Sequence, residues 1–225
     1  MTDSSVQDRL DGVRRGIADA ASLANRKRDE ISLIAVSKTH PVEAILPLIE
    51  AGQRDFGENR VQEAAAKWPE LKARYPDVRL HLIGQLQSNK AEEATELFDV
   101  IHSVDRSSLI QALARATEKS GRRPDCFLQV NLAEEPQKGG CSVAEIPGLL
   151  DEARSAGLPI VGLMCIPPAD LEPAPWFALL AEHAGRHKLP ALSMGMTSDY
   201  STAVMIGATH VRVGTALFGE RETAA

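Results

Sequence analysis

Short apolar segments alternate with amphipathic helical segments along most of the sequence, and this alternation constrains the fold more than any other feature. Eight predicted strands cover residues 31–37, 54–57, 79–83, 100–104, 126–131, 160–166, 191–195 and 210–214. Helices are expected between them, at residues 42–51, 60–73, 89–97, 107–119, 143–156, 173–186 and 199–206. Several strands are apolar nearly throughout, as strands covered on both faces tend to be. Strict alternation of strand and helix therefore favours a parallel sheet.

Eight strands with a helix in every gap favour a closed α/β barrel of the (β/α)8 TIM type. The alternative is an open doubly wound sheet, but such a sheet needs no eighth strand, and no GxGxxG motif follows any predicted strand. No linker or low-complexity segment interrupts the pattern, so a single domain over residues 1–225 is expected.

An additional N-terminal helix is predicted over residues 4–28, where apolar residues recur at spacings of three and four. Ser4 and Gln7 at its start resemble a capping box. Residues 215–225 are too few for a full eighth outer helix, so the N-terminal helix is expected to fill that gap in the ring.

The composition excludes several classes of protein. A formal net charge of −6 and 4% aromatic residues do not favour a nucleic-acid surface. No apolar run approaches the roughly 20 residues of a membrane span, and the polar N-terminus lacks the apolar core of a signal peptide. Cys126, Cys141 and Cys165 are odd in number and lack CxxC spacing, which indicates neither a disulfide framework nor a metal site. A cytoplasmic location is therefore expected.

Polar residues and glycines gather just after the predicted strands, where the active sites of barrels lie. Lys38 directly follows the first strand, and partial desolvation there would free its amine for Schiff-base chemistry. The alternative is a surface lysine at a strand end. His81 lies inside the third strand, where a histidine packed in the barrel interior is the alternative to a ligand contact.

The turns after the last two strands carry a candidate anion site. Gly195, Gly214 and Thr215 lie there, and Thr197 and Ser198 add hydroxyl donors. Barrels often bind phosphate at this place, although tight turns with ordinary helix caps would show the same residues. A reactive lysine and a phosphate cradle on one rim indicate a phosphorylated aldehyde, either pyridoxal 5′-phosphate or a sugar phosphate in a lysine-dependent aldolase.

Seven segments, taken in order, resemble the pyridoxal phosphate homeostasis protein family. They are AVSKTHP (35–41), FGENRVQEAAAK (56–67), HLIGQLQSNK (81–90), HSVD (102–105), GLMCIPP (162–168), LSMGMTSDY (192–200) and RVGTALFGE (212–220). Family members resemble the N-terminal barrel of bacterial alanine racemase without its second, β-rich domain. The resemblance covers about residues 5–221 and implies one cofactor-binding set: Lys38, Asn59, His81, Met194, Thr197, Ser198, Arg212, Gly214 and Thr215.

The resemblance implies that Lys38 holds pyridoxal 5′-phosphate as a Schiff base, that Asn59 approaches the ring hydroxyl and that Arg212 faces the pyridine nitrogen. A permanent positive charge beside that nitrogen disfavours its protonation, which makes the ring a weaker electron sink. Thr197, with Gly214 and Thr215, is expected to hold the phosphate. The family usually has serine where Thr197 stands, so the neighbouring Ser198 is the alternative contact.

Three functions remain open at this stage. The favoured one is a cofactor-binding protein of vitamin B6 and amino-acid homeostasis without robust catalytic activity, because the resemblance implies no established reaction. The others are an amino-acid racemase and the aldolase. A racemase needs a base on each face of the cofactor, and the chain holds only Tyr75 and Tyr200 besides His81 as partners for Lys38. A monomer that transiently contacts cofactor-requiring enzymes is expected, with no nucleic-acid or membrane partner.

Overall fold

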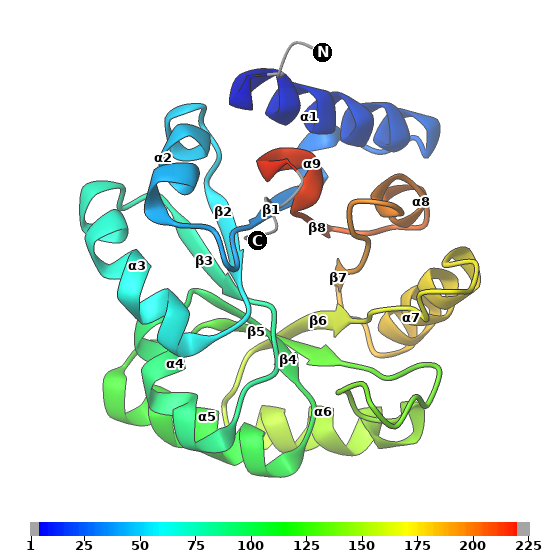
Figure 1. Ribbon diagram of the computed structural model, residues 1–225. Helices are drawn as coiled ribbons and strands as arrows, with labels where there is room; N and C mark the ends of the chain where they lie inside the picture. Colours follow the sequence, from blue (N-terminus) through cyan, green and yellow to red (C-terminus); the bar gives the residue numbers. More distant parts are fainter. Residues whose placement is uncertain (1–4, 220–225) are drawn as a thin grey trace.

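Eight parallel strands form a closed barrel in a computed structural model that describes residues 5–219. Each strand pairs with the next along the chain, and β8 pairs with β1 to close the sheet (Figure 1). The strands are β1 (Ser32–Val36), β2 (Asp55–Glu58), β3 (Arg79–Leu82), β4 (Val100–Val104), β5 (Asp125–Gln129), β6 (Ile160–Met164), β7 (Ala191–Ser193) and β8 (His210–Val213). The predicted (β/α)8 barrel is confirmed, and each strand lies within two residues of its predicted bounds.

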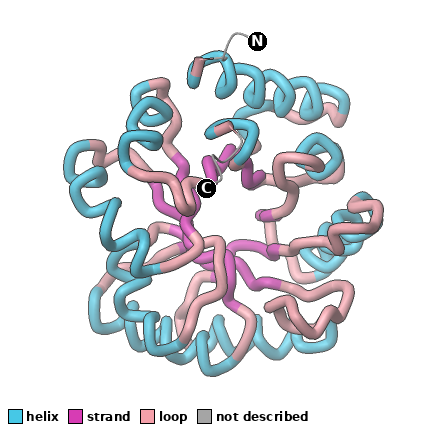
Figure 2. Tube along the Cα trace, viewed as in Figure 1, coloured by secondary structure: helices cyan, strands magenta, loops and turns pink. Residues whose placement is uncertain are grey.

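Helices surround the strands as an outer ring (Figure 2). They are α1 (Val6–Leu23), α2 (Val42–Glu50), α3 (Val61–Arg74), α4 (Ala91–Leu97), α5 (Ser107–Ser120), α6 (Ile146–Ser155), α7 (Ala174–Arg186), α8 (Tyr200–Met205) and α9 (Thr215–Phe218). Short 3₁₀ turns at Ser88–Lys90 and Val143–Glu145 precede α4 and α6, so two predicted helices begin as tighter turns. None of the helices within residues 5–219 has both the length and the apolar character that crossing a bilayer requires.

The N-terminal helix α1 packs against α8 and α9 and so takes the place of the eighth outer helix, as predicted (Figure 1). Its capping box is formed by Ser5 and Asp8, whose side chains bond to each other's backbone N–H. The predicted partner Ser4 lies outside the described residues. The helix ends at Leu23 rather than at residue 28, because Asn25 adopts a left-handed conformation with φ of 54°.

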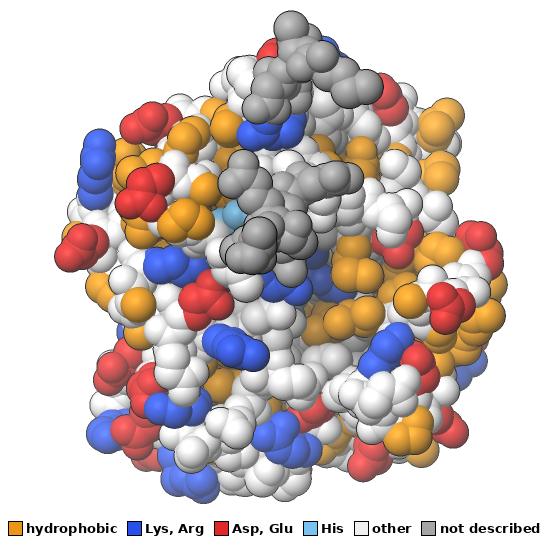
Figure 3. All heavy atoms as spheres, in the orientation of Figure 1, with side chains coloured by type: hydrophobic (Ala, Val, Ile, Leu, Met, Phe, Trp, Pro, Cys, Tyr) orange, Lys and Arg blue, Asp and Glu red, His pale blue; other side chains and the backbone are white. Residues whose placement is uncertain are grey.

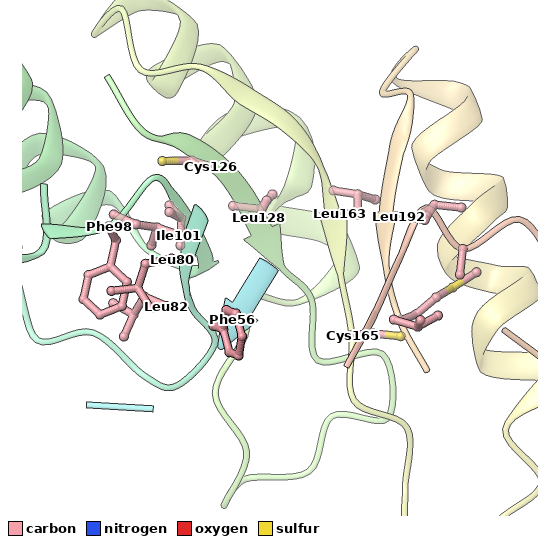
Figure 4. Close-up of a cluster of buried hydrophobic side chains, with 14 of the residues drawn as sticks. Phe56, Leu80, Leu82, Phe98, Ile101, Cys126, Leu128, Leu163, Cys165 and Leu192 are labelled. Carbon is pink, nitrogen blue, oxygen red and sulfur yellow. The ribbon is translucent and has the colours of Figure 1, made fainter. Parts of the chain in front are cut away.

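The main hydrophobic core lies between the strands and the helices. Successive strand residues point to opposite faces of the sheet, and the outward set includes several of the side chains labelled in Figure 4, such as Phe56, Leu80 and Leu128. Inside the barrel, Val100, Phe127 and Met164 form a small separate apolar cluster. Much of the remaining interior is polar, and it includes the buried side chains of His81, His102, Ser193 and Arg212.

Candidate functional site

A cavity of about 290 Å³ opens at the carboxyl ends of β1, β2 and β8 and the turn after β7. Figure 3 shows basic and apolar side chains near the centre of this face. Of the nine predicted site residues, six line this rim cavity: Lys38, Asn59, Thr197, Arg212, Gly214 and Thr215. A larger groove of about 450 Å³ runs between α3 and α4 and is lined by none of them. The structure therefore brings most of the predicted set together at one place.

Helix α3 holds the loop that carries Lys38 in place through hydrogen bonds to its backbone. Thr39 has a φ of 65°, so the chain turns sharply immediately after Lys38. The ammonium of Lys67 donates to the carbonyls of Ser37 and His40, each at 3.2 Å. These bonds fasten the two ends of the turn, and Lys38 itself remains directed at the rim cavity.

Glu58, the last residue of β2, forms an ion pair with Lys67 and so fixes the position of its ammonium group. Its side chain is fully buried, and Oε1 lies 2.8 Å from the Lys67 ammonium. The same oxygen accepts from the Ser37 hydroxyl at 2.7 Å and from the Trp68 indole at 3.0 Å. Glu58 and Lys67 were not predicted, although both stand inside the FGENRVQEAAAK segment, and a buried acid is recognisable only once its surroundings are known.

Asn59 lies against the loop that follows β3. A Cβ atom on Gly84 would stand 2.2 Å from the Asn59 carbonyl oxygen, so only glycine permits this close approach. Asn59 also lines a second cavity of about 260 Å³ beside the first, which is bordered by Gln85 and Gln129. The amide side chain is thus positioned at the boundary between two hollows of the same face.

The turns after β7 and β8 meet at the other side of the rim cavity. Gly195 has a φ of +93°, and a Cβ there would stand 2.5 Å from the Ala203 side chain, so the turn requires glycine. Thr197 Oγ1 accepts from the backbone N–H of Gly214 at 3.4 Å. Thr215 begins α9 and lines the cavity with both of them. Hydroxyl and backbone donors suited to an anion therefore converge here.

Arg212 extends from β8 into the floor of the rim cavity, and it is 5% exposed. Its guanidinium donates to Ser193 Oγ at 2.6 Å and to the Cys165 carbonyl at 3.0 Å. Burial lowers the pKa of Arg212, but a guanidinium keeps its proton in proteins. Among the described residues, no carboxylate forms an ion pair with it. A permanent positive charge thus faces the cavity.

Three predicted residues lie elsewhere among the described residues. Ser198 does not line the rim cavity, whereas its neighbour Thr197 does. Met194 is fully buried in the main core. His81 is fully buried inside the barrel, where Nδ1 lies 2.9 Å from His102 and Nε2 lies 2.9 Å from Asp55. Its environment matches the interior histidine that was the alternative prediction.

The donor set of the rim cavity fits a phosphorylated aldehyde. Lys38 and Arg212 supply two cationic groups, and within residues 5–219 no Asp or Glu is among the side chains that line it. The amine comes from the end of β1, whereas the hydroxyl and backbone donors come from the turns after β7 and β8. An aldehyde and a phosphate on one small molecule could therefore be contacted together.

The sequence matches one protein family over nearly its whole length. The family described as "Alanine racemase, N-terminal domain" matches residues 10–222. The pyridoxal phosphate homeostasis protein of Pseudomonas aeruginosa is 38% identical over 231 residues, with 97% of each chain covered. The protein of the same name from Vibrio alginolyticus is 36% identical, with 97% of this chain and 99% of the relative covered.

Solved structures agree with this similarity. PipY of Synechococcus elongatus PCC7942 without PLP superposes with a TM-score of 0.86 at 42% identity, covering 96% of this chain and all of PipY. PipY with PLP bound gives a TM-score of 0.79 at 45% identity, covering 90% of this chain and all of that one. An alanine racemase from Clostridium difficile has a TM-score of 0.71 at 13% identity, covering 95% of this chain and 58% of the racemase, which shows a shared fold.

Proposed function

Since the chain belongs to the pyridoxal phosphate homeostasis protein family, we propose that it binds pyridoxal 5′-phosphate in the rim cavity and acts in vitamin B6 and amino-acid homeostasis. The observation that carries this proposal is the convergence of Lys38, Arg212 and the Thr197–Gly214–Thr215 donors on one cavity. PipY, at 45% identity, has a structure with PLP bound, which supports the same cofactor here.

Each end of the cavity has a distinct task in this proposal. Pyridoxal phosphate supplies an aldehyde that condenses with a primary amine and releases water. Lys38 offers that amine from a loop that Lys67 holds still. Thr197 and Thr215 would donate hydroxyl hydrogen bonds to the phosphate, and the backbone N–H of Gly214, which bonds to Thr197 Oγ1, would hold the first of these hydroxyls in place.

Arg212 contacts the pyridine nitrogen in this proposal and keeps that nitrogen unprotonated, because two adjacent positive charges repel each other. An unprotonated ring withdraws electrons weakly, which suits a protein that holds the cofactor more than one that removes α-protons. The tyrosines also support this reading over the racemase. A Cβ on Gly16 would stand 2.3 Å from the Tyr200 hydroxyl, so Tyr200 is directed at α1. Tyr75 ends α3 beneath the Arg74 guanidinium.

The remaining parts of the proposal concern the cellular setting. We propose one domain over residues 1–225 and a monomer, because the homeostasis relatives are matched over 97–99% of their own length, whereas only 58% of the alanine racemase is matched. The tail from Glu220 to Ala225 lies outside the described residues. Buried thiols at Cys126, Cys141 and Cys165 support a reducing, cytoplasmic location. Contacts with cofactor-requiring enzymes would be transient.

An absorbance spectrum of the purified protein with pyridoxal phosphate, before and after borohydride reduction, tests the proposal. We expect a visible band in the wild type, a reduced adduct that mass mapping locates on Lys38, and loss of both in Lys38→Ala. Lys90→Ala is the matched control, because Lys90 pairs with Glu93 and does not line the rim cavity. An adduct on Lys90 or Lys138 in the wild type would contradict the assignment of Lys38.

A further inference from the structure

A continuous chain of hydrogen bonds crosses the barrel interior from the rim cavity to the start of β2. Beyond the bond from Arg212 to Ser193, the Ser193 hydroxyl oxygen lies 2.8 Å from Nδ1 of His102. Nε2 of His102 lies 2.9 Å from Nδ1 of His81, and Nε2 of His81 lies 2.9 Å from Oδ1 of Asp55. The four side chains from Asp55 to Ser193 come from β2, β3, β4 and β7 and form what we call the interior relay.

The interior relay is shielded from water along most of its length. The side chains of His81, His102 and Ser193 are each 0% exposed, and only Asp55, with 22% of its side chain exposed, reaches solvent. His102 also stacks on Phe127, with ring centroids 4.5 Å apart. Because these rings are packed, the hydrogen bonds between them have fixed partners.

The chemistry of the groups determines the direction of the hydrogen bonds. A guanidinium only donates and a carboxylate only accepts, so Arg212 donates to Ser193, and His81 donates to Asp55 through Nε2. If His81 carries one proton, its Nδ1 accepts from Nε2 of His102, and Nδ1 of His102 then accepts from the Ser193 hydroxyl. In this arrangement each ring nitrogen of His81 and His102 and the hydrogen of the Ser193 hydroxyl has a partner. In the reverse direction His81 would need two protons, and the Ser193 hydroxyl would lose its acceptor at His102.

The electrostatics of the buried rings agree with this direction. Burial is the main cause that holds the pKa of His102 well below its usual value, and the positive charge of Arg212 adds to it, so the ring is neutral. Burial by itself would raise the pKa of Asp55, but the hydrogen bond from His81 and the charge of Arg79 lower it on balance. When His81 carries one proton, an ionised carboxylate ends a series of neutral groups and polarises each hydrogen bond of the series toward itself.

We propose that the interior relay positions Arg212: it presents the Ser193 hydroxyl oxygen at a fixed point beneath the guanidinium and so sets the contact of Arg212 with the bound cofactor. The proposal rests on the proposed function, because the ligand of the rim cavity is the group that Arg212 meets. It assigns His81 a role different from direct cofactor contact. It also couples Asp55, at the opposite end of the barrel, to the cofactor without any direct contact between them.

Three variants test the relay by cofactor affinity and by the wavelength of the visible band at constant pH. Ser193→Ala removes the acceptor, and we expect affinity to fall about tenfold, with a shifted band. Asp55→Asn keeps an acceptor for His81 but removes the charge, so a smaller change in the same direction is expected. Ser103→Ala is the matched control, because Ser103 is equally buried and its hydroxyl has no partner among the described residues.

A double-mutant cycle separates positioning from general loosening of the barrel. In an Arg212→Met background, Ser193→Ala should leave affinity and band unchanged, because the relay acts only through the guanidinium. A loss that persists there, or wild-type affinity and band in both Ser193→Ala and Asp55→Asn, would overturn the proposal. Asp55→Asn keeps the test decisive if Ser193→Ala does not fold.

Nitrogen-15 NMR of the cofactor-free protein tests the relay independently of cofactor binding. We expect His102 and His81 each to carry the proton on Nε2, whereas a proton on Nδ1 of His102 would refute the direction. Failure of the wild type to bind pyridoxal phosphate would refute the proposed function. The NMR result would still decide the direction of the hydrogen bonds in the interior relay, because it is measured without the cofactor.

Discussion

The ion pair between Lys67 and Glu58 permits a sharp prediction about stability. Lys67 is 11% exposed and Glu58 is fully buried, so the Lys67→Met variant would leave a buried carboxylate without its counter-ion. Breaking a buried pair in this way costs about 3–5 kcal/mol, and Lys67 also loses its bonds to the carbonyls of Ser37 and His40. We expect Lys67→Met to lower the free energy of unfolding by about 3 kcal/mol, which corresponds to about 6–12 °C in melting temperature for a chain of this size.

Urea denaturation followed by circular dichroism measures this loss, and Lys119→Met provides the control. Lys119 and Glu92 form a short ion pair of 2.6 Å, but both side chains are more than 60% exposed. Because solvent screens such pairs, the control should unfold within experimental error of the wild type. Affinity for pyridoxal phosphate should fall in Lys67→Met alone, since only that variant releases the loop of Lys38.

A double variant identifies the cause of the loss. Glu58→Gln combined with Lys67→Met removes both charges and keeps an acceptor for the Ser37 hydroxyl and the Trp68 indole. It should be more stable than Lys67→Met by at least about 1 kcal/mol, since no unpaired charge remains buried. The reasoning is refuted if Lys67→Met loses less than about 1 kcal/mol, or if the double variant is the less stable of the two.

Four further predictions follow from the site and the barrel interior. Thr215→Ala should weaken binding of pyridoxal phosphate by about tenfold to a hundredfold, because hydrogen bonds to charged groups contribute about 1.5–3 kcal/mol; equal affinity for pyridoxal lacking the phosphate would exclude the phosphate cradle. Sedimentation at micromolar concentration should show a monomer, and a stable dimer that buries the rim of Lys38 would contradict this. Exchange of the α-proton of alanine in deuterated water should be slow at saturating cofactor, whereas rapid exchange that needs both Lys38 and Tyr200 would place the protein among the racemases. Burial lowers the pKa of His210 to about 3, while an unfolded histidine takes up its proton near pH 6.5. His210 alone should therefore contribute a loss of stability between pH 6.5 and 3 with a slope of up to about 1.4 kcal/mol per pH unit. In an acid titration of stability, His210→Gln should reduce the total slope by that share; an unchanged slope would show that other groups cause it.

The barrel could be predicted from the sequence because each of its strands and helices is indicated by a short, continuous stretch of residues. Runs such as ISLIAVS and VIHSV mark strands by composition, and each is followed by a helix of ordinary length. The turn residues Gly195 and Thr215 were also recognisable, because barrels place their ligand sites after the strands. Six predicted residues accordingly meet at one cavity.

The face of each strand residue was harder to predict than the strand itself. His81 stands in a correctly predicted strand. Alternation of polar and apolar residues shows which face of a strand is buried only when the other face is exposed to solvent. Both faces of this sheet are covered, so the sequence could not place His81 below the cavity with Asp55. Thr197 and Ser198 are neighbours in one turn, and the backbone path alone decides which hydroxyl lines the cavity. Lys67 acts across the fold on the loop of Lys38, which no local pattern indicates.

The polar interior explains how Arg212 keeps an effective charge at the cavity. Many barrels fill this space with branched apolar side chains, whereas here the apolar packing lies mainly between sheet and helices. A carboxylate in direct contact would neutralise the guanidinium, and its field at the ligand would fall with it. Asp55 instead acts through His81, His102 and Ser193, so the guanidinium is oriented without an adjacent negative charge. Replacing these interior groups with apolar ones could preserve the barrel, but it would leave Arg212 without the hydroxyl acceptor that directs it.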